Sequence, residues 1–184
     1  MLDRYDIESK ILHLLLFTEI NIEEYIHHFR IEKELMMTQL LVSQFINAPA
    51  EVVWPWIADI TKHSLWSPKP FEAKLTSGVI GAVGSTYSSV GFVPPAEKDH
   101  KNEVTITEVI LNRKIVFKSH DENGYFTNTF TLQSEGSGTN VTFQHDFPRM
   151  KGMGMILVPL LVPIVGKRDT KVRLGMLKNK AEGK

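Results

Sequence analysis

The pattern of apolar and polar positions changes once near residue 37. Residues 1–37 carry apolar side chains three or four positions apart with acidic residues between them, a spacing typical of amphipathic helices. Residues 38–46 (TQLLVSQFI) and six later runs have the alternating, β-branched and aromatic composition of strands. The later runs cover residues 71–77, 84–93, 102–111, 114–120, 124–134 and 138–148. This pattern predicts a helical extension followed by a domain with seven strands.

Helical segments flank the later strands. Pro49 begins the first, because proline tolerates the first helical turn, and Pro55 within it predicts a short or kinked helix. A short turn is expected over residues 61–65, and a longer helix from Pro163 to about Asn179 ends the domain. The apolar stripe expected on this last helix comprises Val165, Val172, Met176 and Leu177.

The connections between the later strands are short and rich in turn residues, as at Asn123-Gly124. Short connections join antiparallel neighbours, so the strands should form a meander. One long C-terminal helix against a curved seven-stranded antiparallel sheet is an α+β arrangement. Such a sheet wrapped around a single helix encloses a volume that side chains need not fill, and we expect the functional site there.

Composition places the chain among ordinary globular proteins. It has 184 residues, 42% of them hydrophobic, and its 21 basic residues balance its 21 acidic ones, so no overall charge attracts nucleic acid. The lack of cysteine excludes disulfides and thiolate chemistry. No apolar run reaches the ~20 residues that span a bilayer, and the N-terminus does not resemble a signal peptide. We therefore expect a cytoplasmic protein.

The balanced total hides opposite charges at the two ends. Residues 1–37 carry a net charge of −4 and residues 149–184 one of +7, so the ends should attract each other within the chain or in a homodimer. The apolar stretch 153–165 is interpreted as a buried approach to the last helix, with a transient membrane-surface contact as the alternative. We interpret the bases of the tail as a solvated helix face: Lys167, Arg168, Lys171, Arg173, Lys178 and Lys180.

An ordered series of short stretches carries a family resemblance. The stretches are residues 46–54 (INAPAEVVW), 57–59, Trp66, 83–87, 106–109, 114–117, 129–132 and 138–142. In this order they resemble the START-like, or SRPBCC, superfamily, and most of all its polyketide cyclase/dehydrase and lipid transport branch. The resemblance implies a helix-grip fold and a ligand-binding domain over residues 38–184, with a deep, mainly apolar cavity. Residues 1–37 fall outside it and are either a docking helix or an over-long gene start.

The resemblance leaves the function open between binding and catalysis. The favoured hypothesis is binding or carriage of a hydrophobic small molecule or lipid in the cavity. The alternative is an enzyme of the polyketide cyclase/dehydrase type that uses a cavity histidine for proton transfer, and a third reading is a scaffold whose N-terminal helices dock a partner. No cofactor or metal is expected, because the seven histidines lack ligand spacing and are interpreted as dispersed on the surface.

Strand alternation selects two candidates for catalysis, His145 and Glu108, since each would share the inward apolar face of its strand. The plainer interpretations are a hydrogen-bonded core histidine and an exposed edge glutamate. Trp66 and Tyr87 are expected to line the mouth of the cavity and to supply one polar group each. The residues expected to contact the ligand are Trp66, Tyr87, Ile106, Phe117, Phe126, Phe130, Phe143, His145, Phe147, Val172 and Met176.

Overall fold

The computed structural model describes residues 39–93, 96–121, 124–147 and 162–184. The chain divides into two units, Met1–Met37 and Thr38–Lys184. The predicted helical extension over residues 1–37 and most of the apolar stretch 153–165 lie outside the described residues. All elements discussed below belong to the second unit.

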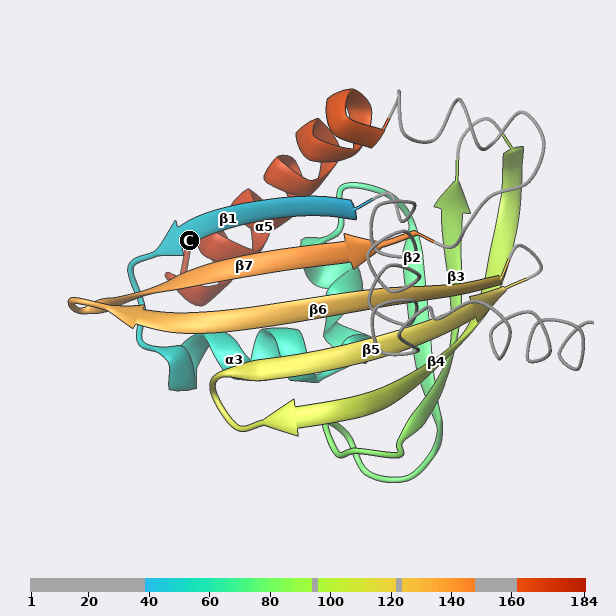
Figure 1. The fold of residues 1–184 in the computed structure, drawn as a ribbon, viewed down its shortest axis with the longest axis horizontal. Coiled ribbons are helices and arrows are strands. Elements are labelled where there is room, and N and C mark those ends of the chain that lie inside the picture. Colours follow the sequence, from blue (N-terminus) through green and yellow to red (C-terminus); the bar gives the residue numbers. More distant parts are fainter. Residues whose placement is uncertain (1–38, 94–95, 122–123, 148–161) are drawn as a thin grey trace, which may run out of the picture. The chain divides into compact units, whose positions relative to one another are not determined.

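Seven strands form a single antiparallel sheet in the order β1-β7-β6-β5-β4-β3-β2 (Figure 1). The strands are β1 (Gln39–Ile46), β2 (Phe71–Ser77), β3 (Thr86–Val93), β4 (Ala96–Ile110), β5 (Lys114–Asp121), β6 (Gly124–Glu135) and β7 (Gly138–Asp146). Strands β2 to β7 follow one another as a meander, and β1 pairs with β7, so the sheet has two edges. The predicted α+β helix-grip arrangement is therefore confirmed.

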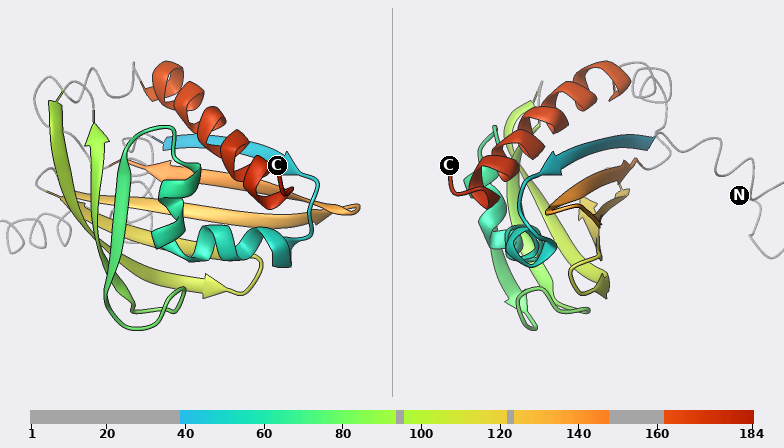
Figure 2. Two further views of the ribbon diagram at one scale, coloured as in Figure 1. Left: turned by 180° about the vertical axis from the view of Figure 1, so that it is seen from behind. Right: turned by 90° about the vertical axis from the view of Figure 1, so that its left-hand side faces the viewer.

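The helices lie together on one side of the bent sheet (Figure 2). They are α3 (Ala50–Ala58), the 3₁₀ helix η1 (Ile60–Trp66), a π-helical turn η2 (Val162–Gly166) and α5 (Lys167–Ala181). Helix α3 is short, as Pro55 predicts, and continues through that residue. The Asp59 side chain accepts the Thr61 amide at 3.1 Å, which begins η1 directly after α3. Within the described residues, no helix is both long and apolar enough to cross a membrane.

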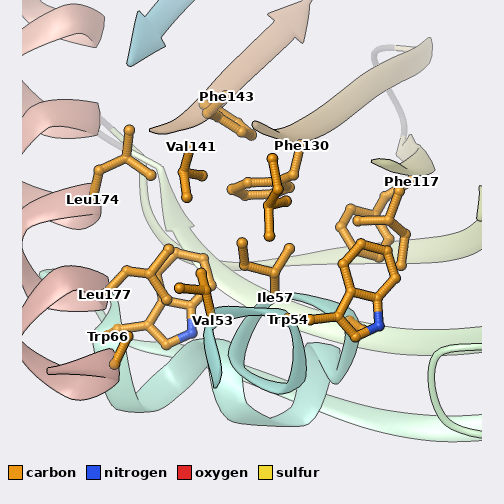
Figure 3. Packing of buried hydrophobic residues seen from close by; sticks show 14 of the residues in the cluster. Val53, Trp54, Ile57, Trp66, Phe117, Phe130, Val141, Phe143, Leu174 and Leu177 are labelled. Carbon is orange, nitrogen blue, oxygen red and sulfur yellow. The ribbon is translucent and has the colours of Figure 1, made fainter. Parts of the chain in front are cut away.

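The core lies between the inner face of the sheet and the helices (Figure 3). Alternate residues of β1 are buried, as period-2 alternation requires. Figure 3 shows Leu174 of α5 directed toward Val141 of β7, and Leu177 of α5 belongs to the same core. Helix α3 contributes Val53, Trp54 and Ile57 to the same core.

A β-bulge in β4 changes which side chains point inward. The pairing of β4 with β5 shifts between Ile106 and Glu108, so Val109 packs against the core and Ile110 is exposed. Glu108 therefore does not share the inward face of Ile106. It forms an ion pair with Lys114 at 2.9 Å, with 43% of its side chain exposed. The predicted inward orientation of Glu108 is wrong, because the bulge interrupts the alternation on which it depends.

Polar contacts attach both ends of α5 to the sheet. Near its C-terminus, Glu182 accepts the Asn47 amide at 2.8 Å and pairs with Lys178 and Lys184 at 2.7 Å each. These contacts lower the pKa of Glu182 to about 2, with the Lys178 hydrogen bond as the largest cause. In the first turn of α5, Asp169 pairs with Lys69, which precedes β2. Helix α5 is thus fixed at one end beside β1 and at the other beside β2.

We expect Glu182→Gln to lower the melting temperature at pH 7. The pKa of Glu182 is lower in the folded chain than the ~4.3 of an unfolded glutamate, so its stabilisation is present above that value and is lost as the pH falls toward 2. The difference from the wild type should therefore narrow between about pH 5 and pH 3. Thermal unfolding of both proteins across this pH range measures the difference in melting temperature. Glu135→Gln, which changes an exposed carboxylate of β6, is the control; an equal, pH-dependent loss there would contradict the account.

Two glycine substitutions should change stability in opposite directions. A Cβ on Gly138 would lie 2.6 Å from the Ile46 carbonyl oxygen and overlap the Phe45 ring, so Gly138→Ala should destabilise the domain by about 1–3 kcal/mol. A Cβ on Gly175 in α5 meets no heavy atom within 4 Å, so Gly175→Ala should stabilise it by roughly 0.5–1 kcal/mol. Urea unfolding of both variants measures the two signs. A stabilising Gly138→Ala would show that the β1–β7 packing described here is wrong.

Candidate functional site

The residues predicted to contact a ligand fall into three groups by exposure. Six are buried in the core: Trp66, Tyr87, Ile106, Phe117, Phe130 and Phe143. Four are half-buried: Phe126, His145, Phe147 and Met176. Val172 is 51% exposed. The inner face thus has a closed end packed by side chains and a part where aromatic surface stays accessible.

Trp66 and Tyr87 do not line a mouth, because both are 0% exposed. Their polar atoms are used inside the domain. The Trp66 indole Nε1 donates to the Trp56 carbonyl at 3.1 Å, and the Tyr87 hydroxyl accepts the Gly81 amide at 3.2 Å. Burial raises the pKa of Tyr87. The expected location at the mouth is wrong for both residues, which instead belong to the core.

Helix phase explains why Val172 points away from the sheet. The buried positions of α5 are Thr170, Leu174, Leu177 and Ala181. Val172 lies two positions from Thr170 and two from Leu174, which places it on the opposite side of the helix. The predicted stripe therefore had the wrong phase at Val172, whereas Met176 does pack partly against the core.

Arg173 is a further candidate for the site, and its assignment to a solvated helix face is wrong. It lies three positions after Thr170 and four before Leu177, and thus on the buried face of α5. Its guanidinium carbon lies 4.7 Å from the centre of the Trp66 ring and 6.0 Å from that of Phe143. The residue is half-buried, and its Nε is closed off from solvent with no hydrogen-bond partner among the described residues. The spacing to buried apolar positions was the signal that could have identified it.

His63 in η1 lies beside this guanidinium and is 4% exposed, so it is not a surface histidine. Its Nε2 lies 2.8 Å from the Ile57 carbonyl oxygen, which can only accept, so Nε2 carries the proton. Nδ1 is then free to accept from Arg173 Nη2 at 3.5 Å. Burial, and after it the Arg173 charge, lower the pKa of His63 to about 3. His63 is therefore neutral at pH 7 and holds one side of the guanidinium.

His145 occupies the accessible part of the inner face, on β7. Its Nδ1 donates to the side-chain oxygen of Asn128, the residue paired with it on β6. The His145 ring centre lies 4.2 Å from that of Phe147 and 5.8 Å from that of Phe126. Burial, and after it Arg173, lower the pKa of His145 to about 4, with Asp146 opposing them. At pH 7 the ring is neutral and Nε2 carries a lone pair, with no hydrogen bond to another described residue.

The site therefore combines one cation with two neutral imidazoles. Burial lowers the pKa of Arg173 to about 10, which leaves the guanidinium charged at pH 7. In the described part of the chain, no three histidine or carboxylate side chains group closely enough to hold a metal ion. The arrangement suits an organic molecule that contacts aromatic rings and a buried positive charge.

Solved structures with the same fold are numerous at low sequence identity. The protein CV1439 from Chromobacterium violaceum superposes with a TM-score of 0.60 at 16% identity, over 79% of this chain and 98% of that one. The Zhui aromatase/cyclase from Streptomyces sp. R1128 gives 0.63 at 16% identity, over 79% and 94%. The di-domain aromatase/cyclase StfQ from the steffimycin biosynthetic pathway gives 0.68 at 13% identity, over 84% and 54%. At these identities the likeness concerns the fold.

Sequence comparison identifies the family. No curated protein matches the chain. Residues 47–154, more than half of its 184 residues, match the family described as Activator of Hsp90 ATPase homolog 1-like protein. The match includes the stretch from Asn47 to Trp54 that carries the resemblance noted in the sequence. The chain therefore belongs to the Activator of Hsp90 ATPase homolog 1-like protein family, within the START-like (SRPBCC) superfamily.

Proposed function

We propose that the domain binds a hydrophobic small molecule or lipid at the accessible part of the sheet's inner face. Phe126, His145 and Phe147 form the edge of this site and are named here the aromatic border. The observation that carries the proposal is the partial exposure of these three neighbouring rings on a face where Phe117, Phe130 and Phe143 are buried. Covering apolar surface contributes roughly 25 cal/mol per Å², so a ligand seated on the rings would gain affinity from them.

The family gives this proposal independent support. The START-like superfamily fold supports binding of hydrophobic ligands, and two similar structures are titled aromatase/cyclases. The inner face of this domain is aromatic, with the Phe126 ring of β6 and the His145 ring of β7 5.8 Å apart. The cavity itself, a membrane-surface contact, a homodimer and a cytoplasmic location remain predictions.

Binding is favoured over catalysis by the basicity of His145. A general base works best when its pKa lies near the operating pH, and a pKa of about 4 makes His145 a weak proton acceptor at pH 7. Glu108, the second catalytic candidate, pairs with Lys114 instead of joining the site. The cyclase alternative keeps one observation in its favour, the lone pair on His145 Nε2 in the same site as the Arg173 charge.

We expect the domain to bind N-phenyl-1-naphthylamine, a neutral apolar fluorophore, with the fluorescence increase that accompanies transfer out of water. Phe126→Ala should weaken this binding about tenfold, because losing ring contacts worth about 1.4 kcal/mol changes the dissociation constant by that factor. Fluorescence titration of the full chain measures both values.

Tyr125→Ala is the matched control, since Tyr125 precedes Phe126 on β6, is 58% exposed and stacks on His120. Its affinity for the fluorophore should equal that of the wild type. Absence of binding by the wild type, or equal losses in the two variants, would contradict the proposed function.

A further inference from the structure

We infer that Arg173 is an anion-binding residue and that the ligand carries an oxyanion, such as a carboxylate or an ionised enol, on a mainly apolar body. The inference rests on the proposed function and adds the chemical class of the ligand. The inference is based on two observations. The Arg173 guanidinium lies against an aromatic ring, and its Nε has no hydrogen-bond partner among the described residues.

The charge of Arg173 is uncompensated among the described residues. Buried charges in proteins are normally paired, because taking an unpaired ion out of water costs several kcal/mol. Two carboxylates that could be considered as partners, Asp169 on the same helix and Asp146 next to His145, have other partners. Asp169, one turn earlier on α5, pairs with Lys69, and Asp146 accepts hydrogen bonds from Gln39 and Gln144. Among the described residues, no carboxylate therefore pairs with Arg173. A bound anion would neutralise its charge.

The neighbours of Arg173 hold it without neutralising it. The face of Trp66 lies against the guanidinium, and neutral His63 accepts one Nη2 proton. These contacts orient the group and leave Nε–H, which is closed off from solvent, without a hydrogen-bond partner. An anion that pairs with Nε–H therefore has to enter the interior beside the guanidinium. A guanidinium binds a carboxylate through two parallel N–H bonds, one of which comes from Nε when the anion approaches from the side.

Because His63 and His145 are uncharged at pH 7, Arg173 is the cation of the site that would bind an anion. The pKa values of about 3 for His63 and about 4 for His145 leave both rings uncharged at pH 7, so neither competes with Arg173 for the anion. Phe143 connects Arg173 with the aromatic border, because its ring centre lies 6.0 Å from the guanidinium carbon and 6.2 Å from the His145 ring centre. An apolar ligand body on the border would then lie near the guanidinium.

A purely structural role makes a different prediction for the stability of the ligand-free protein. If Arg173 only joins α5 to Trp66 by a cation–π contact, replacing it should lower the melting temperature. If it is an unpaired charge kept for a ligand, Arg173→Met removes the desolvation cost and retains the apolar stem. We then expect an increase of about 2–4 °C in the ligand-free melting temperature.

The test compares two fluorophores that differ in one sulfonate group. They are 1-anilinonaphthalene-8-sulfonate, the anionic probe, and N-phenyl-1-naphthylamine, its neutral counterpart. The wild type should bind the anionic probe at least about tenfold more tightly than Arg173→Met does, while the two proteins bind the neutral probe equally. Lys171→Met is the matched control, because Lys171 carries the same charge on the exposed side of α5 and should leave both affinities unchanged.

The outcomes separate the two proposals. If the neutral probe binds and Arg173→Met leaves the anionic affinity unchanged, the inference is overturned and the proposed function stands. If the wild type binds neither probe, the proposed function fails. A lowered melting temperature with loss of both probes overturns the inference in favour of a structural role. If Arg173→Met does not fold, Arg173→Lys serves in its place, because it keeps the charge and removes Nε–H. An unchanged preference of Arg173→Lys for the anionic probe would also overturn the inference.

Discussion

The packing of α5 across the open side of the bent sheet is the constraint on which the rest of the domain depends. A sheet with order β1-β7-β6-β5-β4-β3-β2 leaves β1 and β2 unpaired at its edges. Helix α5 is fixed to the β1 end through Glu182 and to the β2 end through Asp169. Packing on the sheet in this way forces one face of α5 into the interior.

That forced burial produces the candidate site. The inward face of α5 carries Leu174 and Leu177 into the core and Arg173 beside Trp66 and His63. A leucine or methionine at position 173 would complete the apolar face at lower cost, since a buried ion pair or lone charge is rarely a net stabiliser. The guanidinium at this position is thus the feature that packing alone does not explain, and it is the basis of the inference that the ligand is an anion.

Much of the fold could be predicted from the sequence, because alternation and turn residues report local structure directly. All seven strands, the short α3 and the last helix lie where these patterns predict them, with β4 beginning earlier, at Ala96, than the expected residue 102. The predicted side-chain orientations were wrong where contacts between residues distant in sequence determine them. The bulge after Ile106 turned Glu108 outward, and the phase of α5 could be fixed only by knowing which of Val172 and Arg173 faces the sheet. His63 was missed because its burial depends on η1 packing against rings distant in sequence.

The most direct test is to identify what the protein carries in the cells that make it. Native mass spectrometry of the full chain, purified without detergent, would measure the mass of any retained small molecule, followed by its release and chemical identification. The account predicts an acidic, mainly apolar molecule that is retained by the wild type and lost from a variant lacking the Arg173 guanidinium. Retention of an uncharged hydrocarbon or a basic molecule, held equally by both proteins, would contradict it.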